Sequence, residues 1–124
     1  MVALFAARRG FLQGEDAPWI EACRRRLEDI HCSALECYTA SALGLAGGEL
    51  PVGERTAREL IDLAPYRESG YRLLMEILAA RGNIAEALRV YEELRMLLRE
   101  ELGATPSPPI QALQLQLLKA ADLP

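Results

Sequence analysis

Apolar residues recur every three or four positions along most of the chain, with polar residues between them. This spacing is the period of an α-helix, and no segment alternates apolar and polar residues long enough to predict a β-strand. The longest apolar stripe predicts a helix over about 18–46. Its members are Ile20, Cys23, Leu27, Ile30, Ala34, Tyr38, Ala42 and Leu45. The pattern therefore predicts an all-α protein.

Glycine and proline residues divide the helical pattern into about six segments. The other predicted helices run over 2–9, 52–64, 67–81 and 84–102, and a last one begins at 108. Gly82 and Gly103 follow two of them, where a left-handed residue often ends a helix. Asn83 with Glu86 three residues later predicts a capping box. Because the connections are short, neighbouring helices are expected to pack antiparallel.

A 34-residue internal period relates two parts of the chain. The shift places Gly48 on Gly82, Arg55 on Arg89, Glu59 on Glu93, Leu60 on Leu94 and Leu63 on Leu97. Thirty-four residues is the length of the tetratricopeptide repeat (TPR), whose helix pairs stack because one pair cannot bury its own apolar face. The period predicts a TPR-like α-α superhelix of stacked antiparallel helix pairs. A generic helical bundle is the alternative.

The segment 68–101 matches the TPR pattern most closely. Its side chains at the bulky, small and gap-filling positions are Tyr71, Leu74, Leu78, Ala87 and Tyr91. The preceding segment is degenerate, because smaller residues stand at four of the same positions. Those residues are Cys37, Ala40, Gly44 and Gly53. One strong repeat and one weak repeat are therefore expected.

The composition fits an ordinary globular protein and disfavours two classes of partner. The 124 residues are 51% hydrophobic and carry a net charge of −4. A surface that binds DNA phosphates needs positive charge, so no direct nucleic-acid binding is expected. No apolar run reaches the roughly 18 residues of a membrane span, and the first residues lack the order of a signal peptide. A cytoplasmic protein without a membrane contact is expected.

The sequence contains no motif for catalysis, a metal or a cofactor. His31 is the only histidine, and Cys23, Cys32 and Cys37 show no Cys-x-x-Cys spacing. We expect the three cysteines to be buried or half-buried small apolar side chains. No glycine-rich phosphate loop is present, and no carboxylate pair is marked as a general acid and base. The chain is therefore expected to be no enzyme and to hold no cofactor.

Two charged features are candidates for binding. The basic run 24–26 lies within one helical turn of Glu21, Glu28 and Asp29, which favours a solvated, ion-paired face over a DNA contact. The second feature is the TPR groove face of segment 68–101.

In TPR proteins the first helix of each pair lines a concave groove. The matching positions here are Ser69, Arg72, Glu76 and Ala79. Arg72 could hold the carboxylate of a partner peptide. Neutralisation of Arg72 by Glu68 and Glu76, four residues to either side, is the favoured interpretation. Trp19 is expected to pack the first loop onto the long helix, and a role as a partner anchor is the alternative.

Three stretches carry a family resemblance along nearly the whole chain. The first is Arg-Arg-Gly-Phe-Leu at 8–12, followed by Asp-Ala-Pro-Trp at 16–19. The second is Leu-Ala-Pro-Tyr-Arg-Glu at 63–68. The third is Arg-Gly-Asn-Ile-Ala-Glu-Ala-Leu-Arg-Val-Tyr-Glu at 81–92, followed by Pro-Ser-Pro at 106–108. Together they resemble the bacterial transcriptional activator domain of Streptomyces antibiotic regulatory protein (SARP) type regulators, with AfsR and EmbR as relatives.

The resemblance implies a single all-helical domain over 1–124 with no catalytic residues. Such domains usually follow a winged-helix DNA-binding domain. They mediate oligomerisation, contacts within the regulator or contacts with the transcription machinery. The resemblance thus implies a protein-interaction module, expected to be a homodimer. A stand-alone TPR adaptor that binds a partner peptide in its concave groove is the alternative.

The chain also departs from the family pattern at its beginning. We expect it to lack the family's first helix and its DNA-binding domain. The missing helix would leave apolar surface near Leu4 and Phe5 poorly covered, which favours self-association. The candidate partner-binding residues are therefore Leu4, Phe5, Trp19, Arg72 and Glu76.

Overall fold

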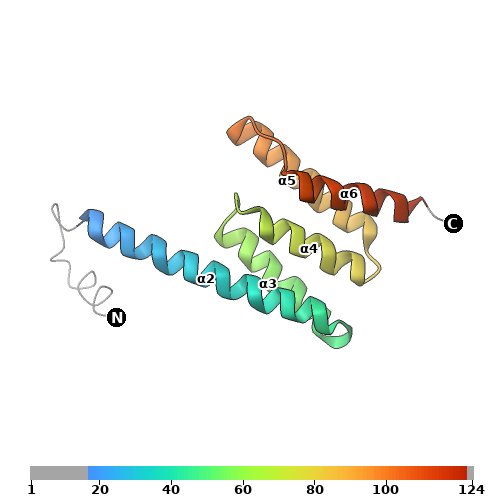
Figure 1. Ribbon diagram of the computed structural model, residues 1–124, viewed down its shortest axis with the longest axis horizontal. Helices are drawn as coiled ribbons and strands as arrows, with labels where there is room; N and C mark the ends of the chain where they lie inside the picture. The colour runs from blue at the N-terminus through green and yellow to red at the C-terminus, as the bar shows by residue number, and fades with distance from the viewer. Residues whose placement is uncertain (1–16, 123–124) are drawn as a thin grey trace. The chain divides into compact units, whose positions relative to one another are not determined.

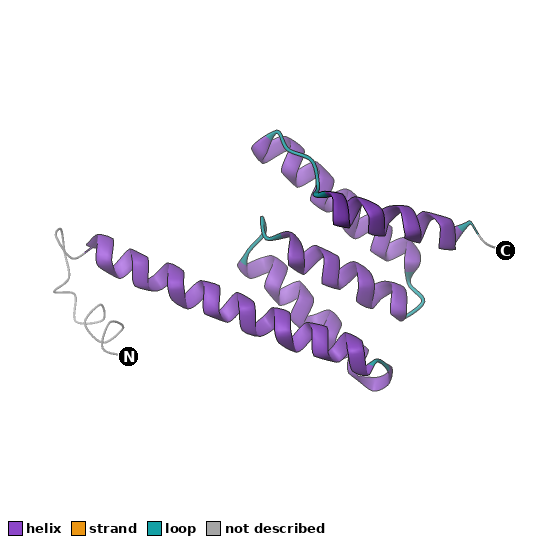
Figure 2. Ribbon diagram, viewed as in Figure 1, coloured by secondary structure: helices purple, strands orange, loops and turns teal. Residues whose placement is uncertain are grey.

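The computed structural model describes residues 17–122, and over that range it consists of helices joined by short connections (Figure 1). The elements are α2 Ala17–Leu45, the 3-10 helix η2 Gly47–Glu49, α3 Leu50–Leu63, α4 Glu68–Ala80, α5 Ile84–Leu102 and α6 Pro108–Ala121. The described range contains no strand (Figure 2). The all-α prediction is confirmed, and the helix predicted over 2–9 lies outside the described residues.

The chain divides into two compact units, 1–33 and 34–124. The described part of the first unit is the beginning of α2. The second unit holds the end of α2 together with η2 and α3 to α6.

Within the second unit, α3 to α6 pack as TPR-like antiparallel neighbours. Helix α4 contacts α3, α5 and α6, and α5 contacts α6. Figure 1 shows α4 between α3 and α5. Connections of only a few residues bring each helix back along its predecessor. The expected stack of helix pairs is confirmed for this unit.

Helix α4 is buried on more than one face. Its buried apolar side chains are Tyr71, Leu73, Leu74, Met75, Ile77 and Leu78. A helix that is apolar around most of its circumference needs neighbours on several sides, as α4 has. The core continues into α5 and α6 through Val90, Leu94, Leu98, Ile110 and Leu117.

Both predicted glycine stops are confirmed. Gly82 has a φ of 81° and Gly103 a φ of 63°, a conformation that costs glycine little. After α5, the N–H of Gly103 donates to the carbonyl of Arg99 and the N–H of Ala104 donates to that of Leu98, both at 3.1 Å. The bond from Gly103 to the carbonyl four residues earlier is that of an αL cap, and with the Ala104 bond it satisfies two of the free carbonyls at the end of the helix.

The predicted capping box at Asn83 is wrong. Asn83 precedes α5, but its side chain makes no capping hydrogen bond. Its backbone N–H donates to the carbonyl of Leu78 at 2.8 Å. A capping box needs Glu86 to accept from that same N–H, so the turn out of α4 has taken the donor.

One of the three cysteines of α2 is more exposed than the sequence predicted. Cys32 is buried and Cys23 half-buried as expected, but Cys37 is exposed. In the second unit, α2 buries Thr39 and Ala42. Cys37 lies about 200° around the helix from Thr39, so it faces away from the buried side.

Candidate protein-interaction surfaces

The first turns of α2 carry an exposed apolar patch. Trp19 is 53% exposed, Leu27 49% and Ile30 59%. At about 100° per residue these side chains fall within an arc of about 80°, so they share one face of the helix. We name Trp19, Leu27 and Ile30 the α2 patch. Large apolar side chains gathered on one exposed helix face are typical of an interaction site.

Of the partner-binding residues predicted in the N-terminal part of the chain, the structure describes Trp19. Trp19 is half-exposed and belongs to the patch. Leu4 and Phe5 lie outside the described residues, so their role stays a prediction. The basic run 24–26 is part of a charged face on which Arg24 donates to Glu21 at 3.1 Å. That ion pair has i,i+3 spacing.

The structure pairs the two groove candidates on α4 with each other. Nη1 of Arg72 donates to Oε1 of Glu76 at 2.6 Å. Glu68, the other acid expected to neutralise Arg72, is engaged elsewhere. Its Oε1 accepts from the backbone N–H of Ser107 at 3.1 Å and from the Ser107 hydroxyl at 2.7 Å. Glu68 thereby caps the N-terminus of α6, where backbone amides lack partners within the helix.

Ser69, a third groove position, is held by a carboxylate of α2. Glu36 accepts from the Ser69 hydroxyl, from Nε of Arg67 at 2.7 Å and from Nη2 of Arg67 at 3.1 Å. The hydrogen bond from Arg67 holds the pKa of Glu36 below its ordinary value, against the opposing effect of partial burial. These bonds tie the second part of α2 to the beginning of α4.

The groove candidates border only a small pocket. A pocket of about 210 Å³ is lined by Glu68, Ser69, Arg72, Ser107, Pro109 and Ile110. Its charged groups already have partners within the chain. Binding of a partner at Arg72 and Glu76 stays a prediction.

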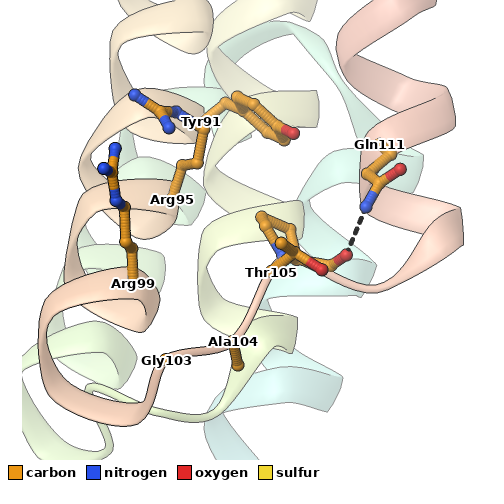
Figure 3. A pocket seen from close by; sticks show the side chains of 8 residues that line it. Tyr91, Arg95, Arg99, Gly103, Ala104, Thr105 and Gln111 are labelled. Carbon is orange, nitrogen blue, oxygen red and sulfur yellow. Dashed lines mark hydrogen bonds between the residues drawn. The ribbon is translucent and has the colours of Figure 1, made fainter.

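A larger pocket lies where α5 turns into α6 (Figure 3). Its volume is about 490 Å³, and it is lined by Tyr91, Arg95, Arg99, Gly103, Ala104, Thr105, Pro106 and Gln111. None of these residues was a candidate in the sequence. The available signal was a pair of arginines one helical turn apart, directly before a glycine- and proline-rich connection.

The polar side chains of this pocket are only partly engaged. Nε of Arg95 donates to both carboxylate oxygens of Glu92 at 3.0 Å, and this hydrogen bond lowers the pKa of Glu92. The side-chain amide of Gln111 donates to the carbonyl of Pro106 at 2.6 Å (Figure 3). Arg99 forms no ion pair with any residue between 17 and 122.

Residues 17–122 contain neither a grouped set of metal-ligating side chains nor a helix that could span a membrane. No three or more histidine, cysteine or acidic side chains there are grouped so that they could hold a metal ion. None of the helices in that range combines the length and apolar character needed to cross a membrane.

Comparison with known proteins relates the chain to one domain family and to bacterial regulatory proteins. The family model of the bacterial transcriptional activator domain matches residues 5–118. The chain is 38% identical over 109 residues to "Regulatory protein AfsR" of Streptomyces coelicolor, which covers 88% of this chain and 11% of that protein. It is 36% identical over 90 residues to "Transcriptional regulatory protein MoaR1" of Mycobacterium bovis, which covers 73% of this chain and 27% of that protein.

The regulatory protein AfsR of Streptomyces griseus is 38% identical over 105 residues, 85% of this chain and again 11% of that protein. The chain thus spans about a tenth to a quarter of the length of these relatives. No solved structure matches the chain.

Proposed function

Because this chain belongs to the bacterial transcriptional activator domain family, we propose that it is the protein-interaction and oligomerisation module of a transcriptional regulator. Its relatives are regulatory proteins, which supports a regulatory role. The proposal assigns no catalysis to the chain.

The observation that carries the proposal is the α2 patch. Trp19, Leu27 and Ile30 are each about half-exposed on one face of a helix. Burying such side chains against a partner removes apolar area from water, at roughly 25 cal/mol per Å². Tryptophan is also enriched among the residues that dominate binding energy at interfaces. We assign this patch to self-association as a homodimer, with Leu4 and Phe5 contributing to the same interface.

The proposal leaves DNA contact to a separate winged-helix domain. The net charge of −4 supports this division, because phosphate binding depends on basic surface. That winged-helix domain and the transcription machinery are the other partners proposed for the module.

The alternative hypothesis, a stand-alone peptide adaptor, has less support than the proposed oligomerisation module. Its key residue, Arg72, is already paired with Glu76 at 2.6 Å. A partner carboxylate would have to displace Glu76. Glu76 lies one helical turn from Arg72 on the same helix, so their ion pair forms without immobilising a second molecule.

Light scattering over a range of concentrations tests the proposal. The chain is expected to have the mass of a dimer, and the double variant Leu27→Glu/Ile30→Glu the mass of a monomer, because two charges from each protomer would be desolvated at the interface. Leu115→Glu is the matched control, since Leu115 is 58% exposed on α6, outside the patch. That variant should remain dimeric.

Two outcomes would overturn the dimer. One is a monomer at every concentration for the unmodified chain. The other is dissociation by Leu115→Glu to the same extent as by the double variant. Circular dichroism of each variant separates loss of association from loss of fold.

A further inference from the structure

The pocket between α5 and α6 is basic in a chain that is acidic overall. Among residues 17–122, Arg95 and Arg99 are the charged residues that line it, and no carboxylate of that range does. The chain as a whole carries a net charge of −4. Glu92 pairs with Arg95 from outside the pocket lining, so the charge at this hollow that has no ion-pair partner among residues 17–122 is that of Arg99.

The two arginines lie close enough to repel each other, although Glu92 offsets part of the charge of Arg95. They are four residues apart on α5, a spacing that brings their side chains together on the helix surface. Figure 3 shows both side chains on the same side of the pocket. Like charges at this spacing destabilise a helix. An anion placed beside both guanidinium groups would remove that repulsion.

Both arginines have donors to spare. Glu92 engages Nε and Nη2 of Arg95 and leaves Nη1 without a partner in the described chain. Arg99 is exposed and makes no ion pair with residues 17–122. A guanidinium presents its donors in a planar fork that matches a carboxylate with two parallel hydrogen bonds.

Hydroxyl groups add to the supply of donors. Tyr91 and Thr105 line the pocket, and neither hydroxyl forms a hydrogen bond with the part of the chain that is described. Tyr91 is otherwise buried, with an exposed fraction of 8%. Its ring and Pro106 give the pocket an apolar wall beside its polar groups.

Two features oppose an anion here, and both are weakened. The C-terminal end of α5 carries partial negative charge. The carbonyls of Leu98 and Arg99 are, however, already bonded to the amides that follow the helix. Glu100 and Glu101 are near in sequence, but both are exposed and neither lines the pocket.

We propose that this pocket binds a side-chain carboxylate from an acidic segment of a partner protein, held between Arg99 and Arg95. Its volume of about 490 Å³ lies within the roughly 300–1,000 Å³ of typical ligand pockets. A single carboxylate brings only one negative charge to this acidic protein. DNA brings one negative charge per roughly 1.7 Å of its axis, so the net charge of the chain disfavours DNA more strongly than a carboxylate. The inference rests on the proposed protein-interaction role, but it uses a surface separate from the α2 patch.

NMR titration of the chain tests the inference. The probe is a short blocked peptide of glycine and serine that carries two glutamates. It should shift the amide signals of residues 99–105, and the same peptide with glutamines should not. Arg99→Gln should weaken binding by about tenfold, the effect of losing one charge-assisted contact. Arg89→Gln is the matched control and should bind as the unmodified chain, because Arg89 is exposed on the same helix outside the pocket.

Three results would overturn the inference. One is unchanged affinity in Arg99→Gln, and another is equal binding of the glutamine peptide. The third is displacement of the glutamate peptide by a DNA duplex at lower charge concentration, which would make the pocket a phosphate site. Because the readout is peptide binding and not molecular mass, failure here is distinguishable from failure of the dimer.

Discussion

The two 34-residue repeats bury different kinds of side chain at equivalent positions. In the strong repeat, 68–101, Tyr71 is 6% exposed, and Leu74 and Leu78 are each 1% exposed. The residues 34 positions earlier are Cys37, Ala40 and Gly44, and all three are exposed. The shared period therefore does not impose shared burial.

The weak repeat relies on a polar contact and on close approach. Thr39 is 0% exposed, and its hydroxyl lies 2.6 Å from that of Thr56, which in turn donates to the carbonyl of Gly53 at 3.0 Å. The residue equivalent to Thr39 in the strong repeat is Leu73, which packs in the core. A hydroxyl pair thus occupies the place of an apolar contact.

The difference follows from the number of neighbours. Helix α4 packs against α3 on one side and against α5 and α6 on others, so bulky side chains fill space in several directions. In a stacked array each helix pair contacts only the adjacent pairs, so a helix next to fewer elements needs fewer bulky residues. Small residues in the weak repeat are therefore compatible with a stable fold.

Truncation of the strong repeat should have the largest effect. Leu74→Ala is expected to lower the free energy of unfolding by about 2–5 kcal/mol, because it leaves a cavity in a packed core. The reverse substitution at the equivalent position of the weak repeat, Ala40→Leu, should alter the free energy of unfolding by less than about 0.5 kcal/mol, because Ala40 is exposed. Urea denaturation measures both. A gain of more than about 1 kcal/mol in Ala40→Leu would show that this face of α2 is covered, and would break the comparison.

Close approach in the weak repeat predicts an intermediate effect. A Cβ added at Gly53 would lie 2.9 Å from Cδ1 of Ile77 and 3.0 Å from Cβ of Ala42. Helix propensity favours alanine by about 1 kcal/mol, but overpacking costs about 1–3 kcal/mol, and the Ala42 methyl group cannot rotate away. Gly53→Ala should therefore destabilise the chain by about 1 kcal/mol in urea denaturation.

Gly44→Ala is the matched control for that substitution. Gly44 lies near the end of α2 with nothing within 4 Å of the added Cβ, so the change should stabilise the chain by up to about 1 kcal/mol. Equal stabilisation by both substitutions would mean that helix spacing at Gly53 is not limiting.

The polar tie between α2 and α4 predicts the smallest effect, and one that depends on pH. The pKa of Glu36 is lowered from 4.5 in the folded chain, chiefly by the hydrogen bond from Arg67. The tie therefore stabilises the fold above that ordinary value, and its contribution is lost as the pH falls through the lowered folded-state pKa. Glu36→Gln should cost about 0.5–1 kcal/mol at neutral pH, and the deficit should shrink in acid.

Urea denaturation from neutral pH to below pH 4 follows this deficit. Glu101→Gln is the control, because Glu101 is exposed on α5 with no ion pair in the range 17–122. A deficit of constant size across the pH range would mean that Glu36 acts through its shape and not through its charge.

Within residues 17–122, the sequence by itself determined the α-helices, their limits to within two residues, and the repeat. Helical periodicity and glycine stops depend on residues close together in the chain, so they can be predicted without knowledge of the tertiary structure. The α5 boundaries at 84 and 102 and the left-handed Gly103 follow in this way. Family membership likewise followed from motifs in a fixed order.

Only the tertiary structure decided which faces are buried and which donors remain available. The long apolar stripe predicted the helix α2, yet its members Leu27, Ile30 and Tyr38 are about half-exposed. Glu68 bonds Ser107, 39 residues away, instead of Arg72, one turn away. The basic pocket likewise exists only because the chain turns at Gly103 and brings Gln111 opposite Arg95 (Figure 3). Periodicity fixes which residues share a face of a helix, but only the packing of neighbours decides whether that face meets protein or water.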